Sequence, residues 1–375
     1  MIYLDCAATS LQKPKSVYHA VRNAMLTMAS PGRGGYKASM LAAETVFYCR
    51  SELAALFHVP APEQVVFTFY ATHGLNIAIN DLVDVGDKVV VSGYEHNSVM
   101  RPLYAKRAGV RVVRSALFDD DEMIEGFASQ LPGAKAAICT AMSNVFGYIT
   151  PVQQIVELCS KHGVPLIVDA SQLAGCGEVD FEKLGAAYIA FPGHKGLLGP
   201  QGTGVLLCGK TPKVLLSGGS GSESRRMEMS ELLPDRLEAG THNVPGIAGL
   251  LEGVRFVRRK GVAQIAAHER RQMERFHKII ADIDGLETFF CEEQSKQGGV
   301  LSVCHKHVDS ELFCQALGEL GIAVRGGLHC APFAHETVGT LDSGTVRFSF
   351  SPFITDDEIK RAAQMTKASV NKQKT

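Results

Sequence analysis

The sequence lacks the features that mark membrane, secreted and nucleic-acid-binding proteins. No apolar run approaches the ~18 residues of a membrane-spanning helix, and the opening segment MIYLDCAATS has neither the basic start nor the apolar core of a signal peptide. Only 21% of the 375 residues are charged and the formal net charge is −1, which argues against electrostatic binding to nucleic acid or membranes. The ten cysteines form no CxxC pair, so we expect free thiols and a cytoplasmic protein.

Common nucleotide and metal motifs are missing too. No G-x-G-x-x-G turn follows an early strand, which leaves a dinucleotide cofactor with little support. Residues 204–211, GVLLCGKT, match the phosphate-loop pattern, but the four middle residues are the apolar interior of a strand and Pro212 follows at once. His305 and His307 have no third ligand nearby in the sequence, so we expect no metal site.

Short apolar runs alternate with helical patterns through most of the chain. This spacing predicts an α/β protein with an open, mostly parallel sheet between helices, in which ligands bind outside the carboxyl ends of the strands. Two runs between Pro165 and Gly204, PLIVDAS and AAYIAFPGHK, end in Asp169 and Lys195. Pyridoxal phosphate needs a lysine for its Schiff base and a carboxylate beside its ring nitrogen. The same two residues could instead be a helix cap and a solvated loop lysine.

Three other polar residues fall at predicted carboxyl ends of strands, namely Thr72, His96 and Asn144. Thr72 lies at the start of a helix, where free N–H groups and the helix dipole favour an anion. A threonine in this position is also a common N-cap. The convergence of five polar groups on one edge of the sheet favours a binding site.

The composition changes at residues 217–241, which are rich in Gly, Ser and charge and which we interpret as a long functional loop or lid. We divide the chain into a large domain, residues 15–250, and a smaller α+β C-terminal domain, residues 251–375, joined by residues 1–14.

Three local expectations concern helices. Thr150 is expected to cap one, and a heavily charged helix ending near residue 283 is expected to face solvent. Thr355 and Glu358 predict a capping box for the last helix.

The segment VRGGLHCAPF, residues 324–333, places Cys330 on a tight and exposed loop. Arg325 and His329 could lower the pKa of its thiol and make it nucleophilic, although a structural loop cysteine is the plainer interpretation. Arg347 stands between apolar residues in TVRFSFS and requires a carboxylate, supplied either by the protein or by a substrate.

The order and spacing of several short motifs resemble the class V aminotransferase superfamily and, within it, the cysteine desulfurase and selenocysteine lyase family. The motifs are YLDCAAT, VDASQ, GHK, GPQGTG, EAGT, RGGLHCAP and VRFSFS, and they span nearly the whole chain. The short cysteine loop is similar to that of the group II desulfurases. The resemblance implies the pyridoxal-phosphate-dependent transferase fold of type I, with a mostly parallel seven-stranded sheet between helices.

The resemblance also implies a role for each matching residue. The catalytic residues would be Lys195 as the Schiff-base lysine, Cys330 as the sulfur-accepting nucleophile, and His96 stacked on the ring. Asp169 would pair with the ring nitrogen, Gln172 with the phenolic oxygen, and Thr72 and His194 with the phosphate, beside His73. Thr241 would reach the phosphate from the partner subunit of a homodimer, and Asn144 (also against the cofactor) and Arg347 would bind the substrate carboxylate.

Four positions depart from the family pattern: Cys6 replaces Asn, Pro192 replaces Ser, His73 replaces Glu and Tyr36 replaces His. Pro192 removes one hydroxyl from the expected phosphate site, and Tyr36 leaves the identity of the substrate open.

The implied reaction converts L-cysteine to L-alanine and leaves a persulfide on Cys330 for transfer to an acceptor protein. Alternatives are a selenocysteine lyase, or another class V aminotransferase or lyase in which Cys330 is incidental. A non-catalytic interaction protein is a further possibility, but binding a partner would require neither Lys195 nor Asp169.

Overall fold

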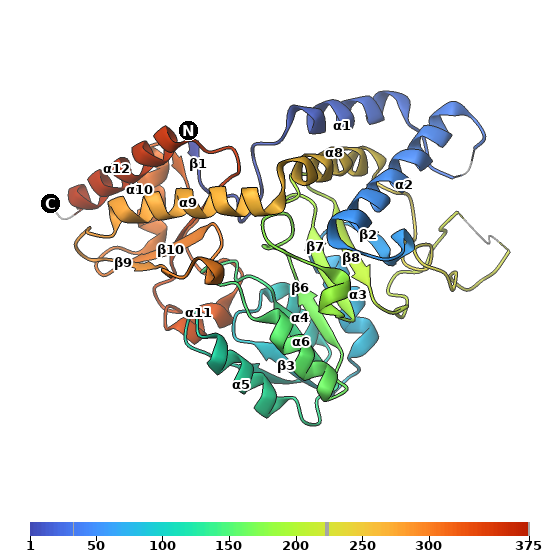
Figure 1. The fold of residues 1–375 in the computed structure, drawn as a ribbon, viewed down its shortest axis with the longest axis horizontal. Helices are drawn as coiled ribbons and strands as arrows, with labels where there is room; N and C mark the ends of the chain where they lie inside the picture. The colour runs from blue at the N-terminus through green and yellow to red at the C-terminus, as the bar shows by residue number, and fades with distance from the viewer. Residues whose placement is uncertain (33, 222–224, 374–375) are drawn as a thin grey trace.

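The computed structural model describes residues 1–32, 34–221 and 225–373. Its centre is a seven-stranded sheet with the order β2-β8-β7-β6-β5-β3-β4 (Figure 1). All neighbouring strands run parallel except β8, which is antiparallel to both β2 and β7. The strands are β2 (Val65–Thr68), β3 (Lys88–Ser92), β4 (Gly109–Val113), β5 (Ala136–Thr140), β6 (Leu166–Asp169), β7 (Tyr188–Pro192) and β8 (Gly204–Cys208). The predicted mostly parallel sheet is therefore present.

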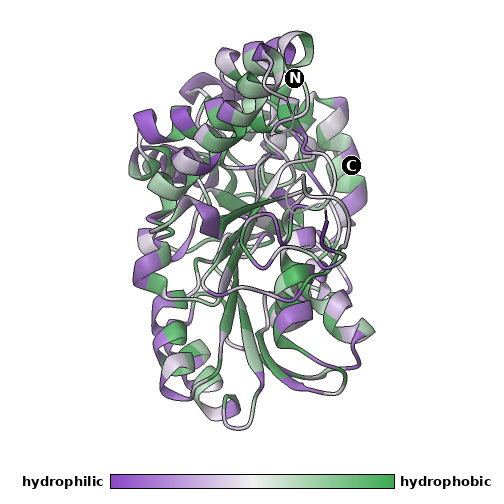
Figure 2. Ribbon diagram, turned by 90° about the vertical axis from the view of Figure 1, so that its right-hand side faces the viewer, coloured by the Kyte–Doolittle hydropathy of each residue, from purple (hydrophilic) through white to green (hydrophobic). Residues whose placement is uncertain are grey.

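The strands are apolar on both faces because helices cover both faces. In β3, Val90 packs into one core layer while Val89 and Val91 pack into the other, as the two-residue period of a strand requires. Figure 2 shows these hydrophobic strands between helices of mixed polarity. One layer contains α2 (Lys37–Phe57), α5 (Asp120–Gln130), α6 (Val152–Lys161), α7 (Phe181–Leu184) and part of α8 (Val244–Lys260); the other contains α3 (Ala71–Leu82) and α4 (Asn97–Ala105). Helix α1 (Lys15–Thr27) packs against α8.

A smaller part of the chain forms around a three-stranded antiparallel sheet with the order β12-β10-β9. Its own hydrophobic core contains Phe276, Phe313 and Phe348. Its elements are α9 (Val262–Ile280), β9 (Leu286–Phe289), β10 (Val300–His305), α10 (Ser310–Glu319), β12 (Val346–Ser349) and α12 (Asp356–Gln373). The short helix α11 (Pro332–Val338) packs against the core of the large sheet, and single 3-10 turns lie at Pro62–Gln64 and Gln294–Lys296.

The amino-terminal segment joins this smaller part. β1 (Ile2–Tyr3) pairs in parallel with β11 (Ile322–Ala323), and Ile2 and Leu4 enter the core around Phe276. Helix α8 runs through residue 250, where the boundary between the two domains was expected, so the boundary stays a prediction.

Three local expectations have different outcomes. The capping box is confirmed, since Glu358 accepts the N–H of Thr355 at 2.9 Å and Thr355 Oγ1 accepts the N–H of Glu358 at 3.3 Å. Thr150 is not a cap, because its hydroxyl donates to the carbonyl of Thr140 at 2.6 Å. Helix α9 is not simply solvent-facing either, because Glu269 and Arg270 are buried.

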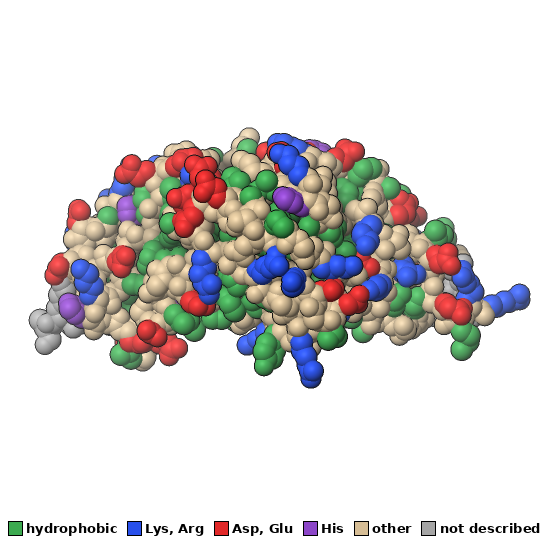
Figure 3. Space-filling model, turned by 90° about the horizontal axis from the view of Figure 1, so that it is seen from below, with side chains coloured by type: hydrophobic (Ala, Val, Ile, Leu, Met, Phe, Trp, Pro, Cys, Tyr) green, Lys and Arg blue, Asp and Glu red, His purple; other side chains and the backbone are tan. Residues whose placement is uncertain are grey.

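Within the described ranges, no helix combines the length and the apolar character required to cross a bilayer. Charged side chains of both signs lie interspersed with apolar ones on the face drawn in Figure 3, in keeping with a net charge of −1.

The sheet depends on aromatic packing at β7, where the rings of Phe191 and Phe57 lie 4.6 Å apart between centroids. We expect Phe191→Ala to lower the free energy of unfolding by about 3–5 kcal/mol, because the ring is fully buried and its removal leaves a cavity. Denaturant unfolding measures the loss. The control is Tyr104→Ala, at a side chain that is 86% exposed. Equal losses in the two variants would contradict this packing.

Candidate active site

Asp169 and Lys195 lie at the ends of neighbouring parallel strands. Asp169 is the last residue of β6 and Lys195 follows β7, and the register places Asp169 beside Ala190. The Asp169 carboxylate is buried and accepts the N–H of Ser171 at 2.9 Å. Burial lowers the pKa of Lys195 to about 8, although the charge of Asp169 acts in the opposite direction. The structure thus brings the acid and the amine into one electrostatic environment, as expected from the sequence.

His96 lies at the start of α4, and its ring is fixed by hydrogen bonds. Its Nδ1 accepts the N–H of Ser98 at 3.0 Å and lies 2.9 Å from Ser98 Oγ. Burial lowers the pKa of His96 to about 4, with Asp169 opposing the shift. The imidazole is therefore neutral at neutral pH, and because Nδ1 accepts an N–H, the ring proton is on Nε2.

Two hydroxyl groups lie where α3 and α4 begin. Thr72, in the first turn of α3, has its Oγ1 2.7 Å from Ser98 Oγ, in the first turn of α4. Two helix N-termini with hydroxyl groups between them form a suitable site for a phosphate. Ser98 was not singled out from the sequence, although its position two residues after His96 at a helix start is a signal that could have found it.

Gln172 and His194 contact the amino-terminal segment. Gln172 Nε2 donates to the carbonyl of Ala7 at 3.0 Å, and His194 Nδ1 lies 2.9 Å from Thr9 Oγ1. Gln172 and Lys195 line one cavity together with Ala7. His194, by contrast, is not hydrogen-bonded to Thr72 in the described part of the chain, so its predicted contact with a phosphate stays a prediction.

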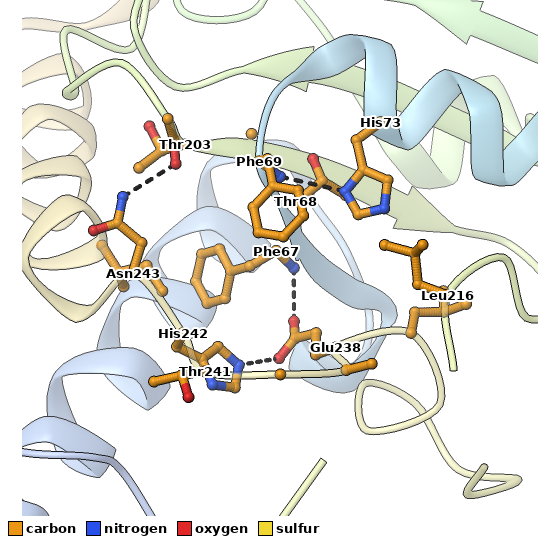
Figure 4. A pocket seen from close by; sticks show the side chains of 16 residues that line it. Phe67, Thr68, Phe69, His73, Thr203, Leu216, Glu238, Thr241, His242 and Asn243 are labelled. Atoms are coloured by element: carbon orange, nitrogen blue, oxygen red, sulfur yellow. Dashed lines mark hydrogen bonds and ion pairs between the residues drawn. The ribbon is translucent and has the colours of Figure 1, made fainter. Parts of the chain in front are cut away.

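Thr241 and His73 line a separate pocket beside the edge strand β2 (Figure 4). The loop that carries Thr241 is fixed by the buried carboxylate of Glu238, which accepts the N–H of Phe67 at 2.6 Å and pairs with Arg50 at 2.8 Å. Arg50 and Glu238 thereby cover the open edge of β2. Thr241 is exposed and does not line the cavity that contains Lys195. Within one chain, Thr241 and Lys195 are therefore not brought together.

Cys330 is exposed on the loop before α11. His329 beside it is buried, and burial together with the nearby charge of Arg347 lowers the pKa of its ring far below the ordinary value. His329 is therefore neutral at neutral pH. The expectation that His329 would supply a positive charge to the thiol is wrong, because its ring points into the protein and bonds Thr345.

Arg347 finds its carboxylate within the protein. Its Nη2 lies 2.9 Å from Oδ1 of Asp5, and Arg325 Nε lies 3.3 Å from Oδ2 of the same carboxylate. Nη1 of Arg347 donates to the carbonyl of Asn144 at 2.9 Å, while its buried Nε has no partner in the described ranges. The carboxylate that Arg347 requires is thus supplied by the protein, from Asp5. A contact between Arg347 and a substrate stays a prediction. Asp5 was missed as a site residue because its partners are more than 300 positions away.

Glu95 is a further buried group beside the site. Its Oε1 accepts the Ser92 hydroxyl and the N–H of Thr140, each at 2.6 Å. Burial raises its pKa to about 8, and the charge of Asp169 acts in the same direction. At neutral pH Glu95 is therefore mostly protonated, and it adds little negative charge beside Asp169.

Comparison with known proteins matches residues 2–362 to the family described as aminotransferase class-V. The chain belongs to this family. A probable cysteine desulfurase of Methanothermobacter thermautotrophicus is 32% identical and covers 96% of this chain and 92% of its own. Another from Pyrococcus abyssi is 31% identical with the same coverage. The resemblance found in the motifs is thus confirmed.

Solved structures agree with the fold of this member of the aminotransferase class-V family. The apo structure of a cysteine desulfurase from Thermococcus onnurineus has a TM-score of 0.90 and 28% identity, and covers 99% of this chain and 95% of that one. A cysteine desulfurase from Escherichia coli, with a TM-score of 0.85 and 24% identity over 99% and 94% of the two chains, supports the fold alone. The predicted fold type I architecture is confirmed.

The lowered pKa of Lys195 has a measurable consequence in the protein without cofactor. We expect pulsed reductive methylation to modify Lys195 half-maximally near pH 8, where its amine loses its proton, whereas ordinary lysines require about pH 10.4. Asp169→Asn should move the midpoint to lower pH, because the carboxylate raises the pKa of Lys195. Peptide mass spectrometry measures the profile, and an unchanged midpoint in the variant would contradict an electrostatic effect of Asp169 on Lys195.

Proposed function

We propose that this member of the aminotransferase class-V family is a pyridoxal-phosphate-dependent cysteine desulfurase. The observation that carries the proposal is the placement of Cys330. Its thiol is exposed, and its carbonyl accepts the N–H of Asn97, which directly follows His96. A cysteine that served only to bind a partner protein would not need to lie against the start of α4, next to His96. The probable cysteine desulfurases among the relatives support the same conclusion.

The residues present fit pyridoxal phosphate. Lys195 is mostly buried with a lowered pKa, so a useful fraction of its amine is unprotonated near neutral pH. The buried carboxylate of Asp169 would hold the ring nitrogen, and the α3 and α4 N-termini with Thr72 and Ser98 would hold the phosphate. When bound, the cofactor would supply the electron sink that allows bonds at the amino acid to break.

The side chains of the chain would then perform the remaining steps. Nε2 of neutral His96 carries the ring proton and can donate a hydrogen bond, since Nδ1 accepts the N–H of Ser98. The Cys330 thiolate attacks the substrate sulfur, the substrate C–S bond breaks, and an S–S bond forms. One L-cysteine and one enzyme thiol thus give one L-alanine and one enzyme persulfide, with the sulfur oxidised and the carbon reduced. A reducing cytoplasm suits this chemistry, and an acceptor protein would receive the sulfur.

We propose further that the protein is a homodimer. Large apolar side chains are exposed on the first two helices, which is unusual for a monomer and typical of an interface. They are Tyr18, Met25 and Leu26 on α1 and Met40, Phe47 and Tyr48 on α2. The exposure of Thr241, away from the Lys195 cavity of its own chain, is compatible with a role at the partner's phosphate.

The role of Cys330 is tested by Cys330→Ala in the protein loaded with cofactor. We expect the cofactor absorption band to persist, because the substitution removes only the thiol and leaves the hydrogen bond from the Asn97 N–H to the carbonyl of residue 330 in place. Alanine production from L-cysteine should fall by at least about a hundredfold, because the sulfur acceptor is gone. Amino-acid analysis after incubation with a thiol reductant measures it. Cys291→Ser is the matched control, and unchanged turnover in Cys330→Ala would exclude the persulfide route.

A shared site is tested by mixing two inactive variants, Lys195→Met and Thr241→Ala. If Thr241 acts in the partner's site, the mixed dimer contains one site with both native residues. Unfolding and refolding the two together should therefore restore about a quarter of native activity in a two-fold symmetric dimer. Each variant refolded alone is the control. Recovery no higher than the average of the separate variants would place Thr241 outside the partner's site.

A further inference from the structure

The loop that carries Cys330 has a strained backbone. His329 and Cys330 have φ values of 51° and 57°, so two consecutive residues other than glycine lie in the left-handed region. L-residues avoid this region, and they stay in it only where the surrounding structure holds them. The strain therefore raises the question of which groups hold the loop.

The carbonyl groups of both strained residues accept hydrogen bonds from the candidate site. Asn144 Nδ2 donates to the carbonyl of His329 at 2.8 Å, and the N–H of Asn97 donates to the carbonyl of Cys330 at 2.8 Å. On the other side, His329 Nε2 lies 3.0 Å from Thr345 Oγ1. Asn144 and His329 are both more than nine-tenths buried, so water does not easily replace the bond between them.

We propose that Asn144 is a positioning residue for the Cys330 thiol. This inference rests on the proposed function. It gives Asn144 a second role, in addition to binding the substrate carboxylate. One N–H of the Asn144 amide holds the carbonyl of His329, and no other hydrogen bond of this side chain is present in the described part of the chain. The second N–H and Oδ1 remain for a ligand. A single amide thus links the substrate site to the backbone conformation of the nucleophile.

The first test measures the loop without any substrate. Asn144→Asp keeps the size of the side chain but loses both donors and turns an oxygen towards the carbonyl of His329. We expect amide hydrogen exchange at Asn97 and Ala331 to become about tenfold faster, because loss of the buried hydrogen bond lets the loop open. Asn144→Ala should give the same result.

The control for exchange is Asn243→Ala, which also removes an asparagine whose Nδ2 donates to a carbonyl, that of Gly202 at 3.1 Å. Its effect should stay near α8 and leave the amides of Asn97 and Ala331 unchanged. Native exchange rates at both amides in the Asn144 variants would overturn the proposal.

The second test separates positioning from substrate binding. With excess thiol reductant, cysteine gives alanine and hydrogen sulfide through Cys330. Selenocysteine gives alanine and elemental selenium without this acceptor, and the thiol reductant then reduces the selenium to hydrogen selenide. We expect Asn144→Asp to lower the ratio of the cysteine rate to the selenocysteine rate by about tenfold. Equal losses on both substrates would show that Asn144 serves binding alone and would overturn the proposal.

The two tests also separate this inference from the proposed function. If the native protein releases no alanine from cysteine, the desulfurase assignment is wrong. The exchange rates at Asn97 and Ala331 then decide alone whether Asn144 holds the loop.

Discussion

The candidate site depends on one carboxylate, that of Asp5. It lies between two arginines, Arg347 at 2.9 Å and Arg325 at 3.3 Å, and so compensates a buried guanidinium that would otherwise be strongly unfavourable. Arg347 in turn holds the carbonyl of Asn144. The same amino-terminal segment continues through Ala7, whose carbonyl accepts from Gln172. A single short segment therefore joins the small sheet, the buried Arg347 with Asn144, and the strand ends of the large sheet.

Burial sets the protonation states around this site. It lowers the pKa of Lys195 to about 8 and that of His96 to about 4, and it raises that of Glu95 to about 8. At neutral pH the imidazole is thus neutral and Glu95 is mostly protonated, while the amine is close to its own pKa. Because His96 and Glu95 carry little charge, the Asp169 carboxylate and the mostly protonated Lys195 amine are left as opposite charges at the strand ends.

Much of the fold could be predicted from the sequence, because short apolar runs ending in polar residues are a local signal. That signal placed Thr72, His96, Asp169 and Lys195 at strand ends or helix starts, where the structure has them. Contacts between distant segments leave no local signal. The partner of Arg347, the inward direction of the His329 ring and the contact of His194 with the amino-terminal segment all depend on packing between such segments. Helix α9 was misjudged for the same reason, since two of its charged residues, Glu269 and Arg270, are covered by other parts of the chain.

The pairing of β1 with β11 affects the order in which the molecule can fold. Asp5 and Arg347 are separated by 342 positions, and the first strand joins a partner more than 300 residues away. Contacts of such long range form late, because closing so large a loop costs much chain entropy. During synthesis the large sheet can assemble before the first few residues have formed their contacts with β11 and Arg347. A ribosome-bound chain that lacks its last strands would therefore have a nearly complete sheet but no assembled site.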